Sequence, residues 1–321
     1  MEARPALAPP RAVQFCRTVG GTPLVELTRL APSEHVRLFA KLEWFNPTGS
    51  VKDRVACAML DAAAEAGELW PGRRILEPSS GNTGIALAMQ GRLRGLDVSI
   101  VMPAGSTPER GQLMRLFGAD VIYSPAELGS NGAVMLAREL AADDPTLYMP
   151  FQYGNAANPR AHERGTAEEI LAACPEIDVL VAGLGTGGTL MGCARRLRRD
   201  RPDLQVVAAE PLPGEGIDGL RSLEDGYTPE ILDLSLLDRK LLVSNEESVR
   251  GLRALAREEG LFAGVSSGGV LHAAMRVAQD VDGPANIVMV LADGGWKYLS
   301  AGLWDTPETE LLERMEQGIW W

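Results

Sequence analysis

Lys52 is the residue whose position most clearly suggests chemistry. It lies in the run NPTGSVKDR at 46–54, where a proline and a glycine interrupt a strand pattern and Ser50 with Asp53 reads as a capping box. The sequence therefore predicts a helix over 51–66 with this lysine in its first turn. The positive end of the helix dipole disfavours an ammonium group there and favours an amine that can form a Schiff base. The alternative is a solvated lysine, and this segment alone does not separate the two.

A second loop has the composition of an anion site. Residues 75–77 end a strand pattern, and the run PSSGNTG at 78–84 leads into a helix predicted over 85–94. Glycines, serines, an asparagine and a threonine at a helix N-terminus offer backbone N–H groups and short hydroxyls, which suit a carboxylate. Taken alone, the loop is equally an ordinary polar connection whose serines cap the helix.

A third loop is rich in glycine. An apolar run at 179–182 leads into GLGTGGT at 183–189, which opens a helix predicted over 190–198. Glycines allow close approach of backbone N–H groups to an anion, so the loop predicts a phosphate site. The spacing GxGxxG at 183–188, with Glu210 at the end of the next apolar run, also matches the dinucleotide fingerprint and taken alone indicates a nicotinamide enzyme.

The three runs together, in this order, resemble the cysteine synthase family of pyridoxal phosphate enzymes, which are tryptophan synthase β-like and of fold type II. A dehydrogenase has no evident use for the first two runs. The resemblance extends from about Gly20 to Tyr298 and includes QYGN at 152–155, GVSSG at 264–268 and WKYLS at 296–300. Within the family, 215–221 and the end IWW at 319–321 are most similar to the B-type enzyme that uses O-phospho-L-serine.

The resemblance implies roles for the residues that would touch the cofactor, pyridoxal 5'-phosphate. Lys52 would hold it as a Schiff base and later remove the α proton of the substrate, and Asn82 would hydrogen-bond the 3'-oxygen of the ring. Ser266 would face the pyridine nitrogen, with Ser267 as its rival; a neutral hydroxyl does not enforce ring protonation, so loss of a β leaving group competes well. The 5'-phosphate would be bound by Gly185, Thr186, Gly187, Gly188 and Thr189.

The resemblance also implies the substrate contacts. The substrate carboxylate would be bound by Ser79, Ser80, Thr83 and Gln152. Many relatives have threonine where this chain has Ser79, which keeps the hydroxyl and loses a methyl group. Arg221 would bind the phosphate of O-phosphoserine; the alternative is a surface arginine paired with Glu224 or Asp225.

The reaction implied is a β-replacement that passes through an α-aminoacrylate and gives L-cysteine. The sulfur would come from a thiocarboxylated sulfur-carrier protein or from sulfide. O-acetylserine sulfhydrylase, with O-acetyl-L-serine as substrate, is the nearest alternative, followed by cystathionine β-synthase; a nicotinamide dehydrogenase and a non-catalytic binding protein are alternatives from other classes. The tail 317–321 would enter the active site by resemblance, whereas its apolar side chains alone favour packing on the enzyme or on a dimer partner.

Composition narrows the partners and the compartment. The 321 residues carry a net charge of −12, which argues against nucleic acid and anionic membranes. No apolar run is long enough to span a bilayer and the start lacks the apolar core of a signal peptide, so we expect a cytoplasmic protein. The cysteines, at 16, 57, 174 and 193, show no paired spacing; we expect reduced thiols and no metal site. The three histidines, at 35, 162 and 272, suggest no chemistry.

Strand-like runs alternate with helical patterns, which predicts an α/β fold with mostly parallel sheets. The strand-like runs are 36–42, 74–76, 98–102, 121–123, 147–149, 179–182, 206–208 and 287–291. The resemblance implies two three-layer domains in a homodimer, with the cofactor between the domains. A small mobile domain, 45–150, would carry Lys52 and the carboxylate loop, and a large cofactor-binding domain would comprise 1–44 and 151–321.

Overall fold

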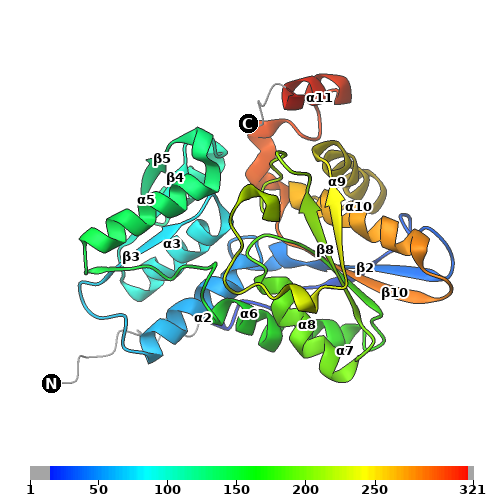
Figure 1. The fold of residues 1–321 in the computed structure, drawn as a ribbon, viewed down its shortest axis with the longest axis horizontal. Coiled ribbons are helices and arrows are strands. Elements are labelled where there is room, and N and C mark those ends of the chain that lie inside the picture. The colour runs from blue at the N-terminus through cyan, green and yellow to red at the C-terminus, as the bar shows by residue number, and fades with distance from the viewer. Residues whose placement is uncertain (1–14, 317–321) are drawn as a thin grey trace. The chain divides into compact units, whose positions relative to one another are not determined.

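The computed structural model describes residues 15–316, in which the strands form two separate sheets (Figure 1). The chain divides into two units, each with its own core. The smaller unit contains residues 15–19 and Lys52–Asn158, and the larger contains Gly20–Val51 and 159–316. The tail 317–321, about which a prediction was made, lies outside the described residues.

The larger unit is built on a six-stranded sheet with the order β1-β2-β10-β7-β8-β9. Neighbouring strands pair parallel except for β1 and β2, which pair antiparallel. The strands are β1 (Leu24–Leu27), β2 (Val36–Leu42), β7 (Val179–Gly183), β8 (Gln205–Pro211), β9 (Arg239–Val243) and β10 (Ala285–Leu291). Parallel strands need crossover connections, and the helices between them supply these.

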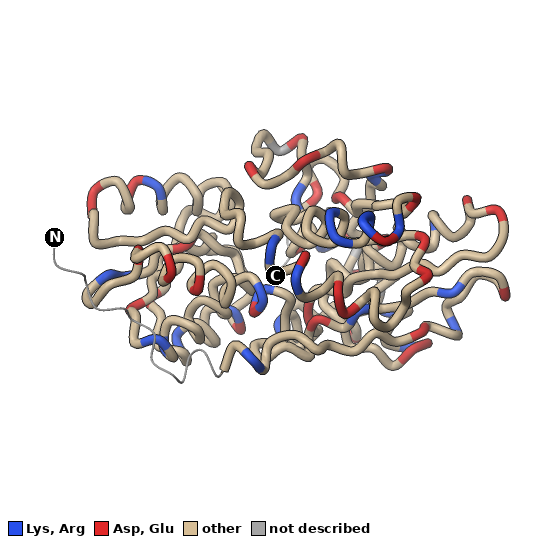
Figure 2. The backbone as a smooth tube through the Cα atoms, turned by 90° about the horizontal axis from the view of Figure 1, so that it is seen from below, with Lys and Arg blue, Asp and Glu red and all other residues tan. Residues whose placement is uncertain are grey.

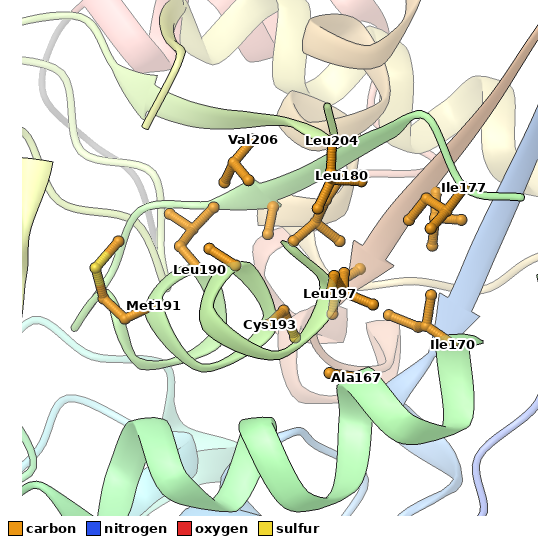
Figure 3. Packing of buried hydrophobic residues seen from close by; sticks show 14 of the residues in the cluster. Ala167, Ile170, Ile177, Leu180, Leu190, Met191, Cys193, Leu197, Leu204 and Val206 are labelled. Atoms are coloured by element: carbon orange, nitrogen blue, oxygen red, sulfur yellow. The ribbon is translucent and has the colours of Figure 1, made fainter. Parts of the chain in front are cut away.

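Helices cover both faces of this sheet. The helices α7 (Ala167–Ala173) and α8 (Gly188–Asp200) lie on one side, and α9 (Asn245–Glu259) and α10 (Val265–Asp280) lie on the other (Figure 1). Alternate residues of a strand face opposite sides, so Leu180 and Val206 pack with Leu190 and Leu197 of α8 (Figure 3). All four side chains are buried, and the larger unit is therefore a three-layer α/β structure.

The smaller unit repeats this plan with four strands, all parallel, in the order β5-β4-β3-β6. Its strands are β3 (Arg74–Pro78), β4 (Val98–Pro103), β5 (Asp120–Ser124) and β6 (Leu147–Tyr148), and its long helices are α2 (Lys52–Glu65), α3 (Asn82–Arg94), α4 (Pro108–Leu116) and α5 (Gly129–Asp143). Ile75 and Ile100 pack with α2 and α3, whereas Leu76 and Val101 pack with α5. The predicted α/β class with mostly parallel sheets is confirmed.

The remaining elements are short. They are the 3-10 helices η1 (Glu43–Phe45), η2 (Ala126–Leu128), η4 (Leu223–Asp225), η5 (Leu234–Leu236) and η6 (Gly295–Ala301), the π-helix η3 (His162–Thr166), and the α-helices α6 (Ala157–Ala161) and α11 (Glu308–Glu316). Acidic and basic residues are interspersed along the backbone of both units (Figure 2). Within residues 15–316, every helix is too short or too polar to cross a bilayer.

The expectation of four reduced thiols is wrong for two of them. Cys16 and Cys57 form a disulfide, with Cα atoms 6.1 Å apart and a sequence separation of 41. The bond joins the segment before Gly20 to α2, and this segment groups with the smaller unit rather than with the larger one as predicted. A pair at that separation has no sequence signature. Cys174 and Cys193 are buried and take part in no disulfide.

Candidate active site

The turn before Lys52 is held by backbone and side-chain contacts within the larger unit. The Val51 amide donates to the carbonyl of Ala292 at 2.8 Å, and Lys297 Nζ donates to the carbonyl of Gly49 at 3.1 Å. Gly49 has φ +77°, and a Cβ there would lie 2.6 Å from the Trp296 ring, so this turn requires glycine. Lys52 follows directly as the first residue of α2, one residue later in the chain than the predicted helix start.

The chain has four lysines, at positions 41, 52, 240 and 297. Lys41 is 1% exposed and donates to Glu169 Oε2 at 2.6 Å. Lys297 is fully buried against Gly49, and Lys240 lies 3.3 Å from a carboxylate oxygen of Glu210. Lys52 is half-buried at a helix N-terminus, where a reactive amine is expected.

The predicted carboxylate loop lies at the carboxyl end of β3 in the smaller unit. Ser79 Oγ accepts hydrogen bonds from the amides of Gly81 at 3.2 Å and Gly84 at 2.9 Å. A hydroxyl oxygen that accepts two N–H groups keeps its own hydrogen to donate. Ser80 accepts from Arg110 through its carbonyl at 3.2 Å, which brings a buried cation behind the loop.

Asn82 and Thr83 begin α3, three residues before the predicted helix start. Thr83 Oγ1 donates to Gln152 Oε1 at 2.6 Å, and both side chains are buried. The structure therefore brings Ser79, Thr83 and Gln152 into one polar cluster, although 73 positions separate the first from the last. Polar side chains gathered at a helix N-terminus form an anion site.

Glu77, which the sequence did not single out, binds the backbone next to this cluster. Its two carboxylate oxygens accept from the amides of Phe151 at 2.7 Å and Gln152 at 2.9 Å. Burial raises the pKa of Glu77 to about 8, against the opposite effect of the two backbone hydrogen bonds. The strand pattern hid this residue, because a lone glutamate at a strand end carries no motif.

The glycine loop of the larger unit lies between β7 and α8, at the carboxyl end of its strand. Gly187 has φ +85° and caps α8, and the Gly188 amide donates to Thr186 Oγ1 at 3.3 Å. A Cβ on Gly185 would lie 2.6 Å from the carbonyl oxygen of Gly219, so this position admits glycine alone without movement of the backbone. The helix begins at Gly188, two residues before the predicted start, because its first turn is made of residues that resemble a loop.

Ser266 lies beside this loop. It is the second residue of α10 and is 4% exposed, and its hydroxyl would be 3.5 Å from a Cβ on Gly219, the residue that covers Gly185. The rival hydroxyl, Ser267 Oγ, is fully buried and has no hydrogen-bond partner. The Ser266 hydroxyl therefore lies close to Gly219, on the side of the glycine loop.

Arg221 is joined to the glycine loop by its backbone. Its amide donates to the Leu184 carbonyl at 2.7 Å, and its guanidinium lies 5.2 Å from the centre of the Tyr227 ring. At 9% exposure this arginine is buried, unlike the surface arginine of the alternative interpretation.

Glu210, the candidate ribose ligand, accepts from the Leu223 amide at 2.7 Å and pairs with Lys240. Its carboxylate has a structural role.

His162 is a further neighbour of the loop that the sequence did not identify. It is fully buried in η3, with Nε2 at 3.4 Å from Thr189 Oγ1 and Nδ1 at 3.0 Å from Thr166 Oγ1. A Cβ on Gly192 of α8 would lie 2.1 Å from the Pro159 carbonyl, so glycine permits this close packing. The sequence gives no sign of this contact, because His162 and Thr189 come together only in the folded chain. The π-helix that contains His162 is of a kind often found at functional sites.

The glycine loop fits the phosphate of pyridoxal phosphate. A Cβ at Gly185 would meet the carbonyl oxygen of Gly219, so the loop carries no side chain at this position. The loop also opens the 13-residue helix α8, whose first N–H groups favour an anion. Among the residues that the structure describes, no three His, Cys, Asp or Glu side chains could hold a metal ion.

Comparisons with known proteins agree with this chemistry. A family model described as "Pyridoxal-phosphate dependent enzyme" matches residues 16–293. A "Probable cysteine synthase" of Bacillus subtilis (strain 168) is 41% identical over 297 residues, covering 89% of this chain and 96% of that protein. "Cysteine synthase B" of Pseudomonas aeruginosa is 40% identical over 288 residues, again covering 89% and 96%. Among solved structures, O-ureido-L-serine synthase is 37% identical with a TM-score of 0.85, covering 93% of this chain and 98% of that one.

The chain belongs to the family of pyridoxal-phosphate-dependent enzymes, in its fold type II branch. Its cofactor is pyridoxal 5'-phosphate, and its curated relatives at about 40% identity include cysteine synthases. The predicted family and cofactor are thereby confirmed, and cysteine synthase activity is supported. The family match also favours the cofactor phosphate over a dinucleotide at the glycine loop.

Proposed function

We propose that this protein is a cysteine synthase that uses O-phospho-L-serine. The single observation that carries the proposal is Arg221, a buried guanidinium whose backbone is hydrogen-bonded to Leu184 at the start of the glycine loop. An arginine binds phosphate with two parallel N–H groups, which an acetyl ester cannot use in the same way. O-acetyl-L-serine is the alternative substrate.

The cofactor, when bound, supplies an electron sink for negative charge at the α carbon of the substrate. In the proposed assignment Lys52 Nζ holds the cofactor and takes the proton from that carbon. Asn82 hydrogen-bonds the ring oxygen, Ser266 faces the ring nitrogen, and residues 185–189 bind the phosphate.

The substrate carboxylate is proposed to bind at the polar cluster of the smaller unit. The hydroxyl hydrogen of Ser79 and the amide of Gln152 are suited to donate to it, because Ser79 already accepts two N–H groups and Gln152 Oε1 accepts from Thr83. Ser80 and Thr83 complete the predicted set. Oriented donors of this kind fix the α carbon relative to the base, which is how positioning lowers a barrier.

Arg221→Ala tests the choice of substrate. We expect kcat/KM for O-phospho-L-serine to fall about a hundredfold, which corresponds to roughly 2 to 3 kcal/mol for a charge-assisted contact, while the value for O-acetyl-L-serine changes little. Arg250→Ala, at an exposed arginine of α9 paired with Glu246, is the matched control and should change neither. Equal losses with both substrates would contradict the proposed selectivity.

The sulfur donor is proposed to be a thiocarboxylated carrier protein, with sulfide as the alternative. Turnover with each donor at saturating O-phospho-L-serine compares them directly. Because O-ureido-L-serine synthase is a structural relative, hydroxyurea is a useful third nucleophile in the same assay. A homodimer stays a prediction of the family resemblance, and a cytoplasmic location stays a prediction from the sequence itself.

A further inference from the structure

Glu77 is a buried titratable residue to which the proposed chemistry assigns no role. It is the fourth residue of β3, its side chain is fully buried, and it lies directly before Pro78 and Ser79 of the carboxylate loop. Burial of a carboxylate is costly unless hydrogen bonds compensate for it. Here the compensation comes from two backbone amides that are adjacent in sequence, those of Phe151 and Gln152.

The backbone that Glu77 binds is strained. Phe151 has φ +54° and is the only residue other than glycine with a positive φ in the part of the chain that the structure describes. A bulky side chain is strained in this region and persists only where the surroundings enforce it. The Phe151 amide and the following Gln152 amide point at the same carboxylate, so Glu77 enforces this turn.

The strained turn determines where the Gln152 side chain lies. The side-chain oxygen Oε1 of Gln152 accepts from Thr83 Oγ1 at 2.6 Å. The backbone carbonyl of Gln152 accepts from Asn158 Nδ2 at 2.9 Å. The amide group is thereby fixed at the N-terminus of α3. Releasing the backbone at Phe151 would move the origin of this side chain, because the turn directly precedes it.

We propose that Glu77 is a positioning residue that acts through Gln152 to bind the carboxylate of the amino-acid substrate. A glutamate is suited to this position because its two oxygens accept from two parallel N–H groups, whereas glutamine offers one oxygen and presents an NH₂ group to the second amide. The proposal rests on the proposed function only in that Gln152 binds a carboxylate. It does not depend on the leaving group.

The test compares two ligands of the holoenzyme, L-alanine and L-alaninamide, which differ in the carboxylate and carry no leaving group. Binding is followed by the change in cofactor absorption on titration. In Glu77→Gln we expect the dissociation constant for L-alanine to rise about tenfold and that for L-alaninamide to stay within about twofold of wild type. Glu127→Gln, at an exposed glutamate of the same unit, is the control. Failure of the O-phosphoserine assignment would leave this contrast unchanged.

A double-variant cycle then asks whether Glu77 acts through Gln152. In a Gln152→Ala background, Glu77→Gln should weaken L-alanine by less than about twofold further. Glu77→Asp, which keeps both acceptor oxygens and shortens the reach, should show the same selective loss and serves where the glutamine variant folds poorly. Equal weakening of both ligands, unchanged binding of L-alanine, or full additivity in the double variant would each overturn the proposal.

Discussion

The β3–α3 loop and the β7–α8 loop both follow a parallel strand and open a helix, yet they present different groups to an anion. The first offers side chains: Ser79 Oγ accepts from the amides of Gly81 and Gly84, and Thr83 donates to Gln152. The second offers bare backbone, since Gly185 lies against the Gly219 carbonyl and Gly187 has a positive φ. Side chains give direction and selectivity for a small carboxylate, whereas backbone N–H groups cradle a phosphate.

The two loops also differ in what supports them. Glu77, which supports the side-chain loop, is a lone buried carboxylate that holds a strained turn 74 residues away in sequence. The glycine loop is supported by short-range backbone geometry and by the Arg221 amide on the Leu184 carbonyl. The side-chain loop therefore depends on a residue distant in sequence to hold its side chains in place. The conformation of the glycine loop depends mainly on its own backbone.

The largest expected effect is at Lys52, which belongs to neither loop. Lys52→Ala should reduce turnover more than about 10³-fold, because the residue holds the cofactor and serves as the base. The fold should persist, since alanine is well tolerated in a first helical turn. Circular dichroism and cofactor dialysis check that the protein is folded and still retains cofactor through the glycine loop. Cysteine formation near the wild-type rate would exclude this role.

The next largest effects are expected for Gly185→Ala and Ser79→Ala, which should distinguish the functions of the two loops. The added Cβ at Gly185 displaces backbone, so cofactor affinity should fall by roughly ten- to a hundredfold, as overpacking costs about 1 to 3 kcal/mol. Ser79→Ala should instead raise the KM for the amino-acid substrate with little change in cofactor affinity. Gly216→Ala is the control for the first, because a Cβ there meets nothing within 4 Å. Identical phenotypes for the two loop variants would remove the distinction between them.

The glycine loop, the parallel strands and the family were all predictable, because each depends on local composition or on motifs. Strands β1 and β9 escaped prediction, since a four-residue edge strand and a five-residue strand that begins with two charged residues carry little periodicity. The contacts of Glu77 and His162 escaped prediction for a different reason. The partners of each lie close only in the folded chain, and one sequence contains no signal for such contacts. The site roles carried over by resemblance stay predictions.

The disulfide should stabilise the smaller unit selectively. In the chain-entropy account, a cross-link over 41 residues contributes about 3 to 4 kcal/mol. A reductant should therefore lower the free energy of unfolding of wild-type protein and leave a Cys16→Ser, Cys57→Ser variant unchanged. Hydrogen exchange should rise over residues 52–158 and not over 159–316. Cys174→Ala is the control for loss of a buried thiol. Uniform exchange changes would argue against a local effect.

The smallest expected step, for a change of one pH unit, is the pH dependence of stability from Glu77. Its pKa is raised by burial from an ordinary 4.5 to about 8, so the folded state retains a proton that the unfolded state has lost between these values. The contribution to stability is present in full below about pH 4.5 and is lost as pH rises to about 8. Relative to Glu77→Gln, the wild-type free energy of unfolding should fall by about 1 kcal/mol per pH unit in this window. Urea unfolding at several pH values measures it; parallel curves would show that Glu77 titrates normally.

The central claim is that the chemistry depends on a cofactor held by Lys52. Reduction of the holoenzyme with borohydride, followed by digestion and mass spectrometry, tests it directly, because the chain offers only four lysines to choose among. We expect one pyridoxyl phosphate group per chain, on Lys52, and loss of the cofactor absorption on reduction. A label on Lys41, Lys240 or Lys297, or a chain that carries none, would contradict the account.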